Sequence, residues 1–186
     1  MRFPLFIASL ALACLLSGTA EARSRNVTDP DAPRSVPANG SVSVDWTDPN
    51  EFSDIRHSGN RWAAQRGNWV EQLARHLQTR ATARLPQGER LEVTLTDIMR
   101  AGQYEPWRAP NLQDARIVRE IYPPRMTLTF RRLDAQGVVI DEGTRSLRDS
   151  GFMMSASSTG SSDPLRFEKN MIDDWIRREF RPQNDA

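Results

Sequence analysis

The sequence predicts an α+β fold, with one antiparallel sheet of about four to five strands and two helices packed on one of its faces. The expected strands alternate apolar and polar residues, so each has one apolar face. Two other segments repeat apolar residues every three or four positions, as amphipathic helices do. The order along the chain is β-α-β-(β)-β-β-α, and the bracketed strand is short.

The first strand is expected at 41–46, where Val42, Val44 and Trp46 alternate with polar residues. A helix is expected over 60–84. Its apolar stripe consists of Trp62, Trp69, Val70, Leu73, Leu77 and Ala81. Gly67 interrupts this pattern, and Asn68 is a candidate cap for its regular part.

The second strand is expected over 90–98, with Leu91, Val93 and Leu95 on its apolar side. A short strand is expected over 116–122. The segments 125–133 and 138–147 predict a hairpin across the turn 134–137, in which Gly137 supplies the left-handed position.

The stretch 149–163 is rich in Ser and Gly and predicts a flexible loop. Asp163 is the expected cap of a final helix, with Pro164 at its first position. The apolar stripe of that helix consists of Leu165, Ile172, Ile176 and Phe180, with Trp175 at its margin.

The N-terminal residues have the pattern of a secretory signal peptide over 1–22. Arg2 is followed by an apolar run and then by Ala20-Glu21-Ala22, which predicts cleavage after Ala22 and a periplasmic location. Residues 23–40 contain three prolines and predict a flexible leader. A single α+β domain is then expected over 41–182, with no transmembrane span in the mature chain.

Cys14 allows a different interpretation of the N-terminus. The stretch Ala11-Leu12-Ala13-Cys14 loosely resembles a lipobox, in which the cysteine becomes a lipid anchor. Leu12 stands where the lipobox has a small residue, so cleavage after Ala22 is the preferred prediction.

Composition excludes several classes of function. The chain has a net charge of +1 with interspersed acids and arginines, which argues against nucleic-acid binding. The mature part contains no cysteine, and the chain has only two histidines, so no metal site or cofactor is expected.

The richest candidate site joins two loops that each carry proline, an aromatic residue and arginine. Its candidate binding residues are Glu105, Trp107, Arg108, Tyr122 and Arg125. Proline stiffens such loops, and binding hot spots favour aromatic residues and arginine. The alternative is a small satellite core, in which Trp107 packs on Tyr122 and arginines bridge to Asp97, Glu105 or Glu120.

No catalytic residue is assigned from the sequence. His57 lies near Asp54 and Ser58, but members of a hydrolytic triad come from separate segments. The favoured hypothesis is an exported, non-enzymatic binding or accessory module whose partner is an unknown envelope protein or envelope component. The alternative is a hydrolase-like enzyme that uses the loop carboxylates Asp97 and Glu105 together with an arginine.

Several segments over about 42–180 together resemble a bacterial family of exported proteins, the domain-of-unknown-function family 3016. The matching stretches are Val44-Asp45-Trp46, Asp48-Pro49, Phe52-Ser53-Asp54, Leu85-Pro86-Gln87-Gly88, Leu95-Thr96-Asp97, Glu105-Pro106-Trp107, Tyr122-Pro123-Pro124-Arg125, Leu147-Arg148-Asp149, and Leu165-Arg166-Phe167-Glu168-Lys169 through Asp173-Asp174-Trp175. The resemblance implies a periplasmic or envelope setting and brings no activity or catalytic residues with it.

Overall fold

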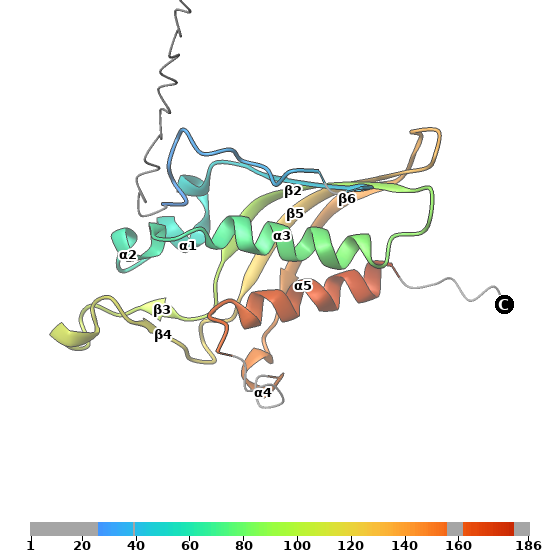
Figure 1. Ribbon diagram of the computed structural model, residues 1–186. Coiled ribbons are helices and arrows are strands. Elements are labelled where there is room, and N and C mark those ends of the chain that lie inside the picture. Colours follow the sequence, from blue (N-terminus) through green and yellow to red (C-terminus); the bar gives the residue numbers. More distant parts are fainter. Residues whose placement is uncertain (1–25, 39, 156–161, 181–186) are drawn as a thin grey trace, which may run out of the picture.

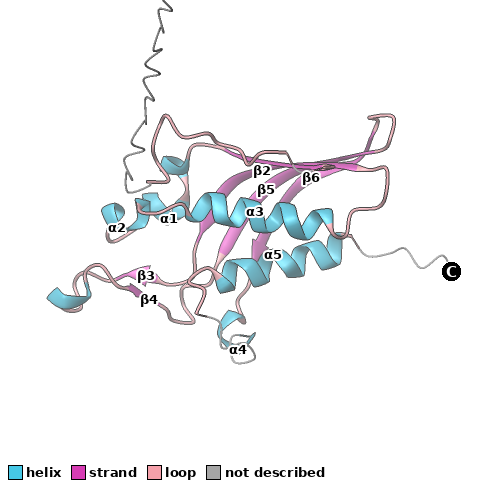
Figure 2. Ribbon diagram, in the orientation of Figure 1, coloured by secondary structure: helices cyan, strands magenta, loops and turns pink. Residues whose placement is uncertain are grey.

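The computed structural model describes residues 26–38, 40–155 and 162–180, and these residues form two layers (Figure 1). A four-stranded sheet is one layer. Helices α3 (Trp69–Thr82) and α5 (Arg166–Glu179) lie side by side on one of its faces (Figure 2). The predicted α+β class is therefore confirmed. The expected signal peptide and Cys14 lie outside the described residues.

The strand order is β1 (Val42–Trp46), β2 (Arg90–Met99), β5 (Arg125–Leu133) and β6 (Val139–Arg148). Neighbouring strands are antiparallel except β1, which runs parallel to β2. The sheet is therefore mixed, and the expectation of a purely antiparallel sheet is wrong at this edge. Helices α1 to α3 connect β1 to β2, and such a crossover permits the parallel pairing.

The helix expected over 60–84 is divided in two. Helix α2 (Arg61–Gln65) ends at Arg66, and Gly67 then has a φ of 87°, which glycine adopts readily. Helix α3 starts after Asn68, as expected. Because of the break, Trp62 does not join the apolar stripe of α3, and its side chain is 62% exposed.

A bulge in β2 changes which residues face the helices. Leu91, Val93 and Leu95 are buried as predicted, but the register with β5 shifts at Thr96. After the shift the buried residue is Ile98, and Asp97 turns to the start of helix α1 (Ser53–Arg56). A bulge inserts one unpaired residue, which inverts the alternation beyond it.

The core fills the space between the sheet and the two long helices. Its largest fully buried side chains include Leu73, Leu77, Leu91, Leu95, Leu128, Ile172 and Ile176. Trp175, expected at the margin of α5, is also buried, and it contacts Phe130 of β5 edge to face. Apart from Trp62, the predicted apolar stripes of both helices therefore form the core against the sheet.

The short strand expected over 116–122 does not join the main sheet. Strand β4 (Arg116–Ile117) pairs instead with β3 (Gln103–Tyr104) in a separate two-stranded ribbon. Residues 102–122, which we call the β3–β4 lobe, project from one end of the main sheet (Figure 1). A hydrogen bond from the Gly102 N–H to the Tyr122 carbonyl (3.0 Å) closes the base of this lobe.

The expected hairpin is present as β5 and β6. Its turn is held by Asp134, whose carboxylate accepts from the backbone N–H groups of Gln136 and Val138. Gly137 has a φ of 84°, as the turn chemistry predicts.

The N-terminal segment is more ordered than its composition suggests. A flexible leader is expected over 23–40, whereas residues 26–38 lie along the domain. Val36 and Arg34 each form a backbone hydrogen bond with β1, and the Val36 side chain is buried. This segment covers the edge of β1, which would otherwise expose unpaired backbone groups.

The C-terminal part also departs from expectation in detail. Within the loop expected over 149–163, α4 (Phe152–Ser155) buries Phe152 edge to face against Phe167, with ring centroids 4.8 Å apart. Residues 156–161 lie outside the described part of the chain. Helix α5 begins at Arg166 rather than next to Asp163, which accepts from the Leu165 N–H. None of the described helices is long and apolar enough to cross a membrane.

Candidate functional site

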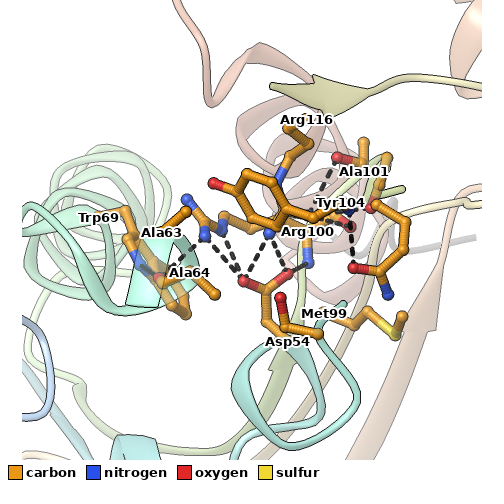
Figure 3. Close-up of polar contacts among 12 residues, drawn as sticks. Asp54, Ala63, Ala64, Trp69, Met99, Arg100, Ala101, Tyr104 and Arg116 are labelled. Carbon is orange, nitrogen blue, oxygen red and sulfur yellow. Dashed lines mark hydrogen bonds and ion pairs between the residues drawn. The ribbon is translucent and has the colours of Figure 1, made fainter. Parts of the chain in front are cut away.

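The base of the β3–β4 lobe is attached to the main body by a buried carboxylate. Asp54, on α1, is only 1% exposed, and it receives two arginine side chains (Figure 3). Arg100, just after β2, donates from its backbone N–H (2.9 Å), Nε (3.0 Å) and Nη2 (2.8 Å). Arg116, on β4, donates from Nη2 to both carboxylate oxygens, at 2.9 and 2.8 Å. We call these three residues the Asp54 anchor.

Both arginines of the Asp54 anchor also lie over aromatic rings. The Arg100 guanidinium is 4.2 Å from the ring centroid of Trp69 at the start of α3, and Arg116 is 4.8 Å from that of Tyr104 in β3. Cations are attracted to the faces of such rings, most strongly when both groups are shielded from water. The anchor therefore connects α1, α3 and the end of β2 to both strands of the lobe.

A backbone close approach reinforces this attachment at the turn between α1 and α2. A Cβ atom at Gly59 would lie 2.4 Å from the Tyr104 carbonyl oxygen, so only glycine allows the two backbones to meet here. The Asn60 side chain donates to the carboxylate of Asp114 at 2.8 Å, and Gln103 donates to the carbonyl of His57. The lobe is thus held along one side as well as at its base.

Inside the lobe, Glu105 is the centre of a second polar cluster. Its side chain is 2% exposed and accepts from the Tyr122 hydroxyl at 2.9 Å and from Arg119 Nη1 at 3.1 Å. Arg108 Nε lies 3.6 Å from its other oxygen. The hydrogen bond from Tyr122 lowers the pKa of Glu105, with a further contribution from Arg119, and the same hydrogen bond raises the pKa of Tyr122.

Three large apolar side chains are exposed on the lobe. Trp107 is 72% exposed and Ile121 is 64% exposed, and Val118 is exposed to a smaller extent. The satellite-core interpretation required Trp107 to pack on Tyr122, and the exposure of Trp107 contradicts it. The part of that interpretation that places arginines against Glu105 is right, since Arg108 and Arg119 both pair with it.

The structure thus brings Glu105, Arg108 and Tyr122 together and places Trp107 on the same lobe. Arg125 is in a different place: it begins β5, and its Nη2 lies 2.7 Å from the sulfur of Met99. Residues 122–125 are adjacent in sequence, but the buried Pro123 and Pro124 separate Tyr122 of the lobe from Arg125 of β5. Arg119 takes the role in the cluster that the sequence suggested for Arg125.

The residues considered for catalysis have separate structural partners. Asp97 accepts from the Ser53 N–H at 2.6 Å and from the Ser53 hydroxyl at 2.8 Å, so it caps helix α1. Both oxygens of Asp54 are held by arginines, whereas His57 is exposed at the end of α1. In the described ranges, no group of three or more His, Cys, Asp or Glu residues is placed to hold a metal ion.

One buried carboxyl lies behind the Asp54 anchor. Glu168 of α5 is 1% exposed and accepts from the Ala101 N–H at 2.6 Å, through Oε1. Burial raises the pKa of Glu168, and Asp54 raises it further, whereas the hydrogen bond from Ala101 and the charge of Arg100 lower it. Glu168 therefore ties α5 to the residue between Arg100 and the lobe.

No sequence pattern predicts the Asp54 anchor. Arg100 and Arg116 lie 46 and 62 residues from Asp54, and no local spacing joins them. The signal that was available is the stretch Phe52-Ser53-Asp54, which carried part of the family resemblance without any role for its aspartate.

Comparison with known proteins identifies one family. A family model described as "Protein of unknown function (DUF3016)" matches residues 40–178. No curated protein and no solved structure matches the chain. The matched range includes the Asp54 anchor, Glu168 and the whole β3–β4 lobe.

We expect Asp54→Asn to lower the free energy of unfolding by about 3–5 kcal/mol, because it leaves two poorly exposed guanidiniums without their carboxylate. Urea denaturation would measure the change. Glu142→Gln, which removes an exposed carboxylate near Arg131, is the matched control and should change stability by no more than about 0.5 kcal/mol. A similar small change for both variants would show that the Asp54 anchor does not stabilise the fold.

Glu168→Gln should change the pH dependence of stability. The pKa of Glu168 is raised in the folded protein, so as the pH rises the carboxyl of Glu168 ionises in the unfolded chain before it ionises in the folded one. Between these two pKa values, ionisation favours the unfolded chain, and the wild type loses stability. The variant lacks this titration, so the wild type's stability relative to the variant should fall as the pH rises above the ordinary range of a glutamate. The fall is about 1.4 kcal/mol for each unit by which the pKa is raised.

Urea unfolding at several pH values measures this difference, and Glu92→Gln controls for the loss of an exposed carboxylate. A pH-independent difference between wild type and Glu168→Gln would contradict the assignment of Glu168 as a titrating group.

Proposed function

The chain belongs to the DUF3016 family, whose description states no activity, and we propose that it is an exported, non-enzymatic binding module of the cell envelope. In this proposal the β3–β4 lobe captures a protein partner. The observation that carries the proposal is the exposure of Trp107 and Ile121 on a lobe whose base is fixed by the buried Asp54 anchor.

Rigid presentation supports binding at this surface. The lobe is held at its base by the Asp54 anchor and along one side by the close approach of Gly59 to Tyr104. Binding a preorganised surface avoids much of the entropy loss that ordering a mobile loop would require.

The composition of the surface also favours a protein partner. Tryptophan and arginine are enriched among residues that contribute most to binding, and Trp107 lies close in sequence to Arg108. Arg108 and Arg119 share the buried charge of Glu105, so the lobe does not present a strong net charge. A mixed surface that carries exposed apolar side chains and partly neutralised arginines suits a protein interface better than a highly charged polymer.

The state of Glu105 supports a binding role over acid–base chemistry. A general acid or base works best when its pKa is near the working pH. The pKa of Glu105 is instead lowered by the Tyr122 hydroxyl and by two arginines, which keeps the carboxylate ionised and paired.

The proposal of export rests on the signal-peptide pattern of residues 1–22.

The double variant Trp107→Ala/Ile121→Ser should lose crosslinked partners while its free energy of unfolding stays within about 0.5 kcal/mol of the wild type, since both side chains are mostly exposed. The measurement is crosslinking in cells, followed by purification of the tagged protein and mass spectrometry. Trp62→Ala, which removes a similarly exposed tryptophan of α2, is the matched control and should retain the partners. Retention by both variants, or loss by both, would argue against the lobe as the binding surface.

Export should leave a mature chain that begins at Arg23. Intact-mass measurement on protein from the periplasmic fraction would test this directly. A mature N-terminus at a lipidated Cys14 would replace free periplasmic export by membrane anchoring, and an unprocessed Met1 in the cytoplasm would overturn the proposed location.

A further inference from the structure

A cavity of about 380 Å³ lies on a part of the domain that the proposed function does not use. It is open to solvent and lies between the N-terminal segment 26–37 on one side and the end of β1 with the start of α3 on the other. Its volume is within the range of small-molecule sites, which is about 300–1,000 Å³. None of its lining residues belongs to the β3–β4 lobe.

The roof of this cavity is tied down at both ends. Near one end the Val27 N–H donates to the Gln65 carbonyl at 2.9 Å. At the other end Val36 and Arg34 exchange backbone hydrogen bonds with Val44 and Trp46 of β1. Between these ties the chain turns through Asp29 and Ala32. The roof is therefore a strap with two fixed ends, and the space under it exists before any ligand arrives.

One part of the interior surface of the cavity is apolar. Trp46 and Val70, both nearly buried in the domain, contribute from the sheet and from α3. Val27, Ala32 and Pro33 contribute from the strap. Such a surface accommodates the apolar body of a ligand, because apolar contact inside a preformed cavity removes surface from water.

Two asparagine side chains supply donors to the cavity. The side-chain oxygen of Asn26 already accepts from Thr28, and that of Asn68 accepts from Gln72 at 2.7 Å. Among the described residues, their NH₂ groups have no such partners, so each amide offers donors rather than an acceptor.

Two guanidiniums add to these donors. Arg34 is 3.3 Å from Asp48, and Arg75 is 2.8 Å from Glu71, but each guanidinium has five N–H bonds and these pairs use only part of them. Asp29 and Glu71 also line the cavity, so the arginine charge is balanced and the specificity comes from hydrogen bonding. Donors beside an apolar wall match a ligand that has an apolar body and one acceptor group.

We propose that this cavity binds a small amphipathic carboxylate, with its apolar body against Trp46 and Val70 and its carboxylate among the donors of Arg34, Arg75, Asn26 and Asn68. A carboxylate accepts from planar guanidiniums in two-point geometry, which a neutral amide reproduces poorly and a cation does not. This site is independent of the lobe and of the partner proposed there.

The test uses 4-phenylbutyrate as the probe, on the chain that begins at Arg23, with 4-phenylbutyramide and 4-phenylbutylamine as its uncharged and cationic matches. We expect the carboxylate to shift the backbone NMR signals of Val27, Trp46 and Val70. We expect it to bind at least tenfold more tightly than either match. No shift at millimolar carboxylate, or equal binding of the amine, would overturn the proposal.

Variants separate the proposed site from nonspecific binding. Arg34→Gln/Arg75→Gln should weaken carboxylate binding at least tenfold, and Ala32→Trp, at an exposed strap position that lines the cavity, should block it. Arg131→Gln, on the open face of the sheet, is the matched control for the loss of an exposed arginine. Trp107→Ala should also bind normally, which distinguishes this site from the lobe. Unchanged binding by the double arginine variant would refute the assignment even if Ala32→Trp failed to fold.

Discussion

The carboxylate of Asp54 is the group on which the arrangement of this protein most depends. It lies beneath the surface at the one place where helix α1, the end of β2 and the β3–β4 lobe meet. A carboxylate removed from water is unfavourable unless charged donors replace the lost hydration, and the two arginines of the Asp54 anchor supply these donors. The aromatic rings of Trp69 and Tyr104 then fix the directions of the guanidiniums. A lobe with little apolar core of its own is thereby held in one orientation.

Two different devices control the edges and faces of the sheet. At β1, the segment 34–36 forms backbone hydrogen bonds with the strand, so part of the backbone along this edge of the sheet is paired with the N-terminal segment. Within β2, the bulge at Thr96 turns Asp97 away from the core and aims it at the first turn of α1. The bulge lies toward the end of β2 from which the lobe projects, and the segment beside β1 is part of the strap that lines the cavity. Each proposed site therefore lies where one of these two features ends or covers the sheet.

Much of the fold was predictable because its signals are local. The strand alternation of Val42, Val44 and Trp46, the turn at Gly137 and the stripe of α3 each depend on a few neighbouring residues. The direction of β1 was not predictable in this way, since nothing within a strand states which neighbour it will pair with. The candidate site was predicted in part: Glu105, Arg108 and Tyr122 are adjacent to one another, whereas Arg125 is separated from them by the buried prolines at 123 and 124. Trp62 was assigned to the core because its spacing fits the apolar stripe of one continuous helix. The break at Gly67 turns α2 away from the axis of α3, and sequence periodicity does not reveal the size of that turn.

By itself, the sequence determined the α+β class, the two amphipathic helices, the hairpin and the aromatic–arginine character of the lobe. These properties follow from periodicity and turn chemistry, which act over a few residues. Only the tertiary structure decided that Asp54 receives arginines from 46 and 62 positions away, that Trp107 is exposed rather than packed, and that the strap leaves a cavity above Trp46. Each of these depends on the distance between segments remote in sequence. Such distances are set when the apolar faces of different segments pack against one another. The sequence of one segment does not specify which other segment it will pack against.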